Sequence, residues 1–186
     1  MIFLIIFIFL IVIPIYKVLQ ADNRQLQNNW SQYLDNMQYS TKDFYVRLKN
    51  ELSDYDIEQL DIKEVTLSEG GLLSSNRLYL RVSWKDFQYD VCFAPFGNSA
   101  CFISWWLLRV PSSVEVVFSA IPVVGIWLSR IFYPETYFRI DSANMFMTFA
   151  QSKVLKILDE LMKENQITAL PEFDRYPLKQ SIKVNR

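Results

Sequence analysis

The stretch RLYLRVSWKDFQYDVCFA, residues 77–94, decides the fold of this chain. Apolar and polar residues alternate on both sides of Lys85 and Asp86, which is typical of two β-strands joined by a tight turn. A hairpin that turns there places apolar side chains opposite one another on one face: Trp84 and Phe87, Val82 and Tyr89, Leu80 and Val91, Leu78 and Phe93. The other face pairs Arg81 with Asp90 and Ser83 with Gln88. A slip of one residue would turn every apolar side chain outward, so this register is the one we expect.

Further strands are expected on both sides of this hairpin. Residues 62–67 are expected to form an earlier strand, and residues 101–107, CFISWWL, return after a turn through residues 95–98. The result is a meander of three to five antiparallel strands. A four-residue loop before the last strand would set Cys92 opposite Cys101, and a six-residue loop would set it opposite Ile103.

The last of these strands is apolar on both faces. In the expected registers one set of side chains faces the core, namely Phe102, Ser104 and Trp106, and the other set points away, namely Ile103, Trp105 and Leu107. A strand with one face in water should alternate between apolar and polar residues. Another segment must therefore cover Trp105, and the apolar residues 114–133 are the candidate.

Residues 114–133 form an apolar segment that Pro122 and Gly125 interrupt near its middle. The interruption predicts a hydrophobic helical hairpin with two short arms. The fourteen uncharged residues between Glu115 and Arg130 would reach only about 21 Å as one helix, short of the roughly 30 Å of a bilayer core. We expect this hairpin to dip into a membrane or to cover the sheet, and a second full span is the third alternative.

Two amphipathic helices are expected to pack on the core face of the sheet. The first follows the capping residues Ser40 to Asp43 and lines one face with Phe44, Leu48 and Leu52. The second begins at Asp141 or Ser142, and its apolar residues recur at helical spacing: Ala143, Phe146, Phe149, Ala150, Val154, Ile157, Leu158 and Leu161. The predicted fold class is therefore α+β, a two-layer domain over residues 40–170.

Residues 1–19, MIFLIIFIFLIVIPIYKVL, are almost wholly apolar. As a helix they would reach about 28 Å, close to the thickness of a bilayer core. No basic residue precedes the run and no small-residue cleavage site follows it, so an uncleaved transmembrane anchor is favoured over a cleaved signal peptide. Lys17 and Arg24 come next, and the positive-inside rule then places most of the chain in the cytoplasm.

Residues 20–39 are predicted to form a helical stalk between the anchor and the domain. Apolar residues recur there at heptad spacing, and four of them are candidates for self-association: Leu26, Trp30, Tyr33 and Met37. A stalk that leans on its own domain is the favoured interpretation, with a parallel coiled coil as the alternative. Residues 171–186 contain two prolines and no periodicity, which predicts a flexible tail or a segment that contacts anionic lipid or a partner.

The composition excludes several kinds of chemistry. The 186 residues include no histidine, which removes His-dependent triads and His-ligated metals. Lys and Arg number 19 against 20 Asp and Glu, so there is no basic surplus for nucleic acid. None of the four glycines opens a phosphate-binding helix. Cys92 and Cys101 are spaced for neither a redox motif nor zinc, so reduced structural thiols are favoured over a cross-strand disulfide. We predict no catalytic residue, no cofactor and no metal, and a chain that is not an enzyme.

Two functions remain as hypotheses. The first is a membrane-anchored interaction or scaffold protein that presents its α+β domain to a protein partner or to itself, with membrane lipid as a further partner. The alternative is a module that binds lipid or an apolar small molecule between the sheet and the hydrophobic hairpin; its candidate residues are Ile103, Trp105, Trp106 and Trp127. A polar recognition patch is predicted from Arg77, Tyr79, Arg81 and Asp90.

Overall fold

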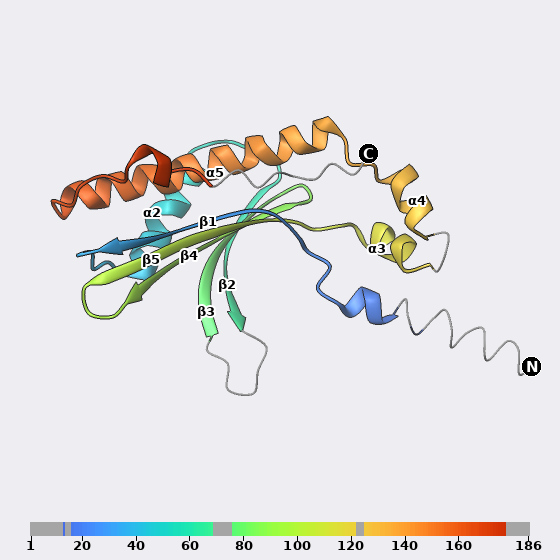
Figure 1. Ribbon diagram of the computed structural model, residues 1–186, viewed down its shortest axis with the longest axis horizontal. Helices are drawn as coiled ribbons and strands as arrows, with labels where there is room; N and C mark the ends of the chain where they lie inside the picture. The colour runs from blue at the N-terminus through green and yellow to red at the C-terminus, as the bar shows by residue number, and fades with distance from the viewer. Residues whose placement is uncertain (1–12, 14–15, 69–75, 122–124, 178–186) are drawn as a thin grey trace, which may run out of the picture.

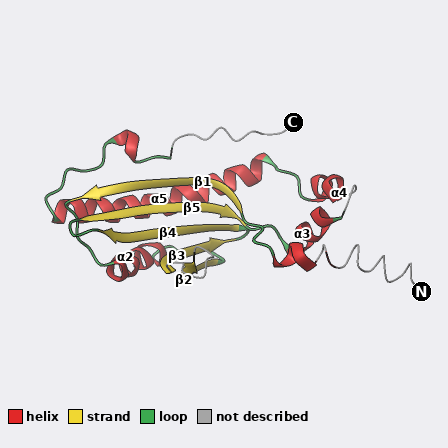
Figure 2. Cartoon of the chain, turned by 60° about the horizontal axis from the view of Figure 1, so that its bottom comes forward, coloured by secondary structure: helices red, strands yellow, loops and turns green. Residues whose placement is uncertain are grey.

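The computed structural model describes residue 13 and residues 16–68, 76–121 and 125–177. The protein is α+β, with a five-stranded antiparallel sheet and two helices, α2 (Thr41–Ser53) and α5 (Tyr137–Glu164), packed on one face of the sheet (Figure 1). Two short helices, α3 (Ser113–Ala120) and α4 (Gly125–Phe132), lie beyond one end of the sheet (Figure 2). These two helices agree with the predicted break at Pro122 and Gly125, but they do not cover the face of the sheet.

The strands follow the order β1-β5-β4-β3-β2 across the sheet. Their bounds are β1 Gln25–Asp35, β2 Leu60–Ser68, β3 Asn76–Trp84, β4 Phe87–Phe96 and β5 Ala100–Arg109. The strands β2 to β5 form a meander, whereas β1, the first in sequence, pairs with β5, the last. The helix α2 follows β1, α5 follows β5 by way of α3 and α4, and both pack on the same face of the sheet.

The register predicted for the hairpin of β3 and β4 is confirmed from Trp84–Phe87 to Leu80–Val91. Beyond that pair the two strands separate, and the predicted pairing of Leu78 with Phe93 is absent from the ladder. The hydroxyl of Tyr45, on α2, lies in the gap: it donates to the Leu78 carbonyl at 2.8 Å and accepts from the Phe93 N–H at 3.1 Å. A side chain of a helix thus supplies the hydrogen bonds that a strand pair would otherwise make.

The faces predicted for β5 are wrong. The loop between β4 and β5 has three residues, 97–99, with Phe96 opposite Ala100 and Gly97 at a φ of 68°. This loop length differs by an odd number of residues from the four- and six-residue loops that we expected. An odd difference in loop length turns every side chain of the strand to the other face. Trp105 therefore lies opposite Val91 on the helix-covered face, while Trp106 lies on the second face.

The same register places the two cysteines on opposite faces of the sheet. Cys92 pairs with Ser104 on the second face, whereas Cys101 lies on the core face, where its thiol contacts the Met37 carbonyl at 3.2 Å. Both thiols are free and buried, and burial raises the pKa of each. The cross-strand disulfide is thus excluded by the faces on which the two residues lie.

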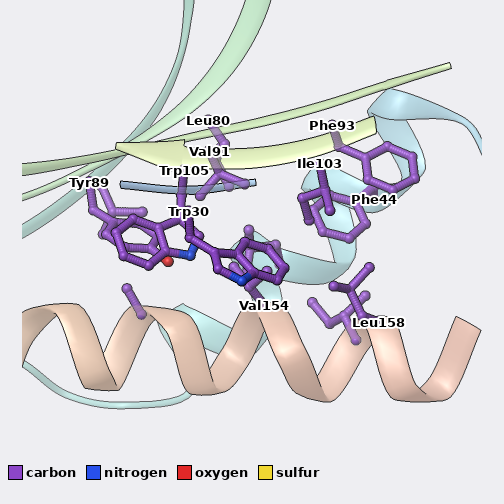
Figure 3. Packing of buried hydrophobic residues seen from close by; sticks show 14 of the residues in the cluster. Trp30, Phe44, Leu80, Tyr89, Val91, Phe93, Ile103, Trp105, Val154 and Leu158 are labelled. Atoms are coloured by element: carbon purple, nitrogen blue, oxygen red, sulfur yellow. The ribbon is translucent and has the colours of Figure 1, made fainter. Parts of the chain in front are cut away.

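The core lies between the sheet and the two helices and is rich in aromatic rings (Figure 3). Trp105 stacks between Tyr89 and Trp30, with ring centroids 5.0 and 6.5 Å away. Phe44 of α2 stacks on Phe93 of β4 at 4.3 Å. The apolar stripe of α5 closes this layer from the opposite side, and each large side chain that is fully buried there contributes about 1.5–3 kcal/mol.

The helical stalk predicted for residues 20–39 is wrong, because Gln25–Asp35 form β1. The four residues of the predicted heptad stripe do not share a seam. Trp30 and Met37 are buried in the core, while Leu26 and Tyr33 are about half exposed. A strand at this position buries Trp30 and Leu34 against α5 and pairs the backbone with β5, a gain that an isolated stalk helix could not match.

The predicted transmembrane helix is not borne out by the described residues, nor are the membrane location and the cytoplasmic placement of the domain that rested on it. Within the described ranges no helix is both long enough and apolar enough to cross a bilayer. The 28 residues of α5 are long enough but carry charged side chains, and α3 and α4, at 8 residues each, reach only about 12 Å. Residues 1–12, 14 and 15 of the predicted span lie outside the described residues.

The flexible tail predicted for residues 171–186 is wrong for its first part. Residues 171–177, which we call the strap, include a short helical turn at Glu172–Asp174 and lie against β1 and α5. Hydrogen bonds and an ion pair hold the strap there despite its lack of periodicity. Residues 178–186 lie outside the described residues.

Candidate interaction surface

The helices α3 and α4 form a hairpin that we call the arm. Ser112 caps α3 by accepting a hydrogen bond from the Glu115 N–H at 3.2 Å. Gly125 begins α4 and approaches α3 closely, since a Cβ at this position would lie 2.3 Å from the Phe118 carbonyl oxygen. The ring of Phe118 in turn packs on Phe132, with centroids 5.7 Å apart. The two helices of the arm therefore pack tightly on each other.

A buried arginine joins the arm to the sheet. Arg109, the last residue of β5, is 3% exposed and donates through Nη2 to both carboxylate oxygens of Glu115 at 2.6 and 2.8 Å. Its Nη1 donates to Gln25 at 3.2 Å, and its Nε lies 3.5 Å from Asp86. Burial alone would lower the pKa of Arg109, but the hydrogen bond and charge of Glu115 outweigh it and the pKa is raised. The arginine therefore stays charged and fixes the base of α3.

The arm and the first turn of α5 carry six exposed apolar side chains. We call these residues the arm surface: Val114, Trp127, Ile131, Phe132, Tyr137 and Phe138. Each is more than half exposed, and Tyr137 reaches 85%. Isolated exposed apolar residues are ordinary, but a group of this size with four aromatic rings is typical of a binding surface.

The predicted apolar site is not brought together. Ile103 and Trp105 are fully buried in the core, Trp106 is 39% exposed on the second face of the sheet, and Trp127 lies on α4. These four side chains occupy three separate places, so they do not line one pocket. The error follows from the loop before β5, which we expected to have an even number of residues.

The predicted polar patch does come together on the second face of the sheet. Arg81 holds Asp90 through two hydrogen bonds of 2.7 Å, and the carboxylate of Asp90 is 3% exposed. Arg24 adds a second cation 4.0 Å from Asp90 and pairs with Asp22, whose pKa the arginine lowers to about 2. Sequence reasoning missed this second pair because residues 20–39 were assigned to a stalk.

The remaining two members of the patch lie beside this network. Tyr79 is half-buried, and burial raises its pKa while Arg77 offers it a hydrogen bond. Both side chains also contact the thiol of Cys92. Arg81 and Arg24 pair with the carboxylates of Asp90 and Asp22, and Arg77 lies against Tyr79 and Cys92. The network is therefore best explained as support for the sheet.

Two hollows mark the described surface. One, of about 670 Å³, is wide open and lies between residues 38–40 and the loop after β4. The other, of about 280 Å³, lies between β1 and the strap. In the part of the chain that the structure describes, no three acidic or cysteine side chains cluster as a metal site would require.

No family model and no curated protein matches this chain. Among solved structures the chain is similar to a truncated norcoclaurine synthase from Thalictrum flavum, with 11% sequence identity, over 61% of this chain and 96% of that chain. The TM-score is 0.22, too low to support any inference about fold or activity. A functional proposal for this chain therefore depends on its own surfaces and contacts.

Proposed function

We propose that this chain is a non-enzymatic interaction protein that assembles with a second copy of itself through the arm surface. The observation that carries the proposal is the exposure of six apolar side chains on the arm and the first turn of α5, outside the packed core. Phe132 packs on Phe118 within the arm, but it and the other five side chains each leave more than half of their surface in contact with water. Covering them in an assembly would remove apolar area from water.

The size of the arm surface agrees with an interface. Since a single aromatic side chain presents about 150–250 Å², these six partly exposed residues offer on the order of 800 Å². Each partner in a standard interface also contributes about 800 Å². Tryptophan and tyrosine, both present here, are the residue types that dominate binding energy at such surfaces.

A second copy is the partner that this surface fits best. The six residues carry no charge, so apolar contact rather than ion pairing would hold a partner against them. An apolar surface is complementary to itself, which is what a two-fold interface requires. The net charge of −1 adds almost no repulsion between two copies.

The test is sedimentation velocity of the full chain over a hundredfold range of concentration. We expect a concentration-dependent dimer that the double variant Trp127→Ser, Phe132→Ser weakens at least tenfold. Phe96→Ser is the matched control, because Phe96 is as exposed as Trp127 but is the last residue of β4, at the other end of the sheet from the arm. Circular dichroism would establish that all variants keep the fold.

Three results would overturn the proposal. The first is a wild-type chain that stays monomeric at every concentration. The second is a dimer that the double variant leaves unchanged. The third is a monomer that binds phosphatidylcholine vesicles through the arm, which would give the arm surface a different occupant.

A further inference from the structure

The strap is held mainly through its main chain. The indole Nε1 of Trp30 donates to the Asp174 carbonyl at 2.6 Å, and the amide of Gln32 donates to the same oxygen at 3.2 Å. From the other side, the amide of Gln151 donates to the Arg175 carbonyl. Donors from β1 and α5 thus converge on two consecutive carbonyls, and such contacts do not depend on the side chains of the segment they hold.

One contact does depend on a side chain of the strap. Arg175 places its guanidinium against Asp159 of α5, with Nη2 to Oδ1 at 2.7 Å and Nη1 to Oδ2 at 3.0 Å. This two-point geometry suits arginine and cannot be reproduced by lysine. The groove between β1 and α5 therefore has three amide or indole donors for a main chain and one carboxylate for an arginine.

The donors of this groove need an acceptor. With the strap in place Trp30 and Gln151 are 5% and 4% exposed, and donors buried to this extent are nearly always hydrogen-bonded. A peptide main chain in the turn that residues 172–175 adopt offers two consecutive carbonyls to these donors. The groove is thus built to hold a peptide, whichever chain supplies it.

The strap itself is a weakly held occupant. Its two large side chains turn outward, with Phe173 79% and Tyr176 56% exposed, so the strap buries little apolar surface of its own. The pair of Arg175 and Asp159 is partly open to water, which limits its strength. A hollow of about 280 Å³ remains between the strap and β1. These features are typical of a segment that can be displaced.

We propose that the groove lined by Trp30, Gln32, Gln151 and Asp159 is a binding site for a short, arginine-bearing peptide segment of a partner protein that adopts the same turn as the strap. Residues 171–177 occupy this site in the free chain. The arginine of the partner segment replaces Arg175 at Asp159, and two consecutive carbonyls of that segment accept from the donors of β1 and α5. This site is separate from the arm surface and does not rest on self-association.

The experiment measures binding of a labelled synthetic peptide with the sequence of residues 170–177, LPEFDRYP, to the full-length chain by fluorescence anisotropy. Arg175→Ala weakens the strap, so this variant should bind the peptide about fivefold more tightly than the wild-type chain does. The double variant Asp159→Ala, Arg175→Ala should lose that gain. The tighter binding to the Arg175→Ala chain should also disappear when the peptide carries alanine in place of its arginine. Asp61→Ala in the Arg175→Ala chain is the matched control, because Asp61 is an exposed, ion-paired aspartate on the distant strand β2.

A second measurement uses the wild-type chain and does not depend on any variant folding. Hydrogen–deuterium exchange would follow the amides of Asp174 and Arg175, which donate within the turn of the strap. Excess peptide should speed their exchange as it displaces the strap. Unchanged exchange at the highest soluble peptide concentration would overturn the proposal. Binding to Arg175→Ala that Asp159→Ala leaves intact would also overturn it.

Discussion

Replacing Tyr45 and Tyr89 by phenylalanine should change the stability of the fold in opposite directions. Both side chains are buried, at 1% and 0% exposed. The hydroxyl of Tyr45 fills the gap between β3 and β4 and bonds to Leu78 and Phe93. The hydroxyl of Tyr89 has no hydrogen-bond partner among the described residues. The two substitutions remove the same atom from the same kind of environment, so only its hydrogen bonds differ.

The expected magnitudes follow from those bonds. Tyr45→Phe leaves the Leu78 carbonyl and the Phe93 N–H in the gap without their partner. An unsatisfied buried group costs about 1–3 kcal/mol, so the free energy of unfolding should fall by about 2–4 kcal/mol. Tyr89→Phe removes a hydroxyl that is buried without a partner, and the free energy of unfolding should rise by about 1 kcal/mol.

Urea unfolding followed by far-ultraviolet circular dichroism measures both changes, provided that the two variants keep the same dependence on urea. A loss below about 1 kcal/mol for Tyr45→Phe would refute the role of this hydroxyl in joining the two strands. An equal loss for both variants would show that the hydrogen bonds of Tyr45 are not the cause.

Two further predictions concern charge. Burial raises the pKa of both Tyr45 and Tyr89 above the ordinary value of 10.0, so the folded chain favours the neutral phenols. Their contribution to the free energy of unfolding should be fully present below pH 10 and lost as the pH rises above it. Tyr89→Phe should reduce that loss, as measured by urea unfolding at alkaline pH. Asp90→Asn should lower the free energy of unfolding by about 3 kcal/mol because it leaves Arg81 half-paired in a buried site. Asp61→Asn, in an exposed pair with Lys63, should cost under about 1 kcal/mol, and equal losses in urea unfolding would contradict this distinction.

The register of the hairpin of β3 and β4 could be predicted because one of its faces is apolar and the other is polar. Apolar residues on one face and the pair of Arg81 and Asp90 on the other allow only one register. For β5 the sequence offers no such choice, since Trp105 and Trp106 are equally compatible with a core face. Only the three-residue loop at Gly97 decides between them, and its length depends on a backbone conformation that no hydrophobic pattern encodes.

The strand β1 was missed for a different reason. Its partner β5 lies about 75 residues away in sequence, and the polar run around Trp30 has no alternation of its own. Long-range pairing can override a local pattern in this way. The contacts of the strap reach even further, from Trp30 to Asp174, so no local pattern could reveal the groove. The position of the arm, in contrast, follows from the interruption of an apolar segment at Pro122 and Gly125.

The contacts that build the core differ in kind from those that hold the two proposed binding elements. Rings and aliphatic side chains fill the space between the sheet and α5, whereas the arm depends on Arg109 at its base and the strap on hydrogen bonds to its carbonyls. Apolar burial supplies most of the stability of a domain of this size. Loss of the arm surface or of the strap contacts should therefore change binding while leaving most of the unfolding free energy in place. Under the two proposals the core would stay folded while the arm and the strap exchange partners, which is the property that an interaction protein needs.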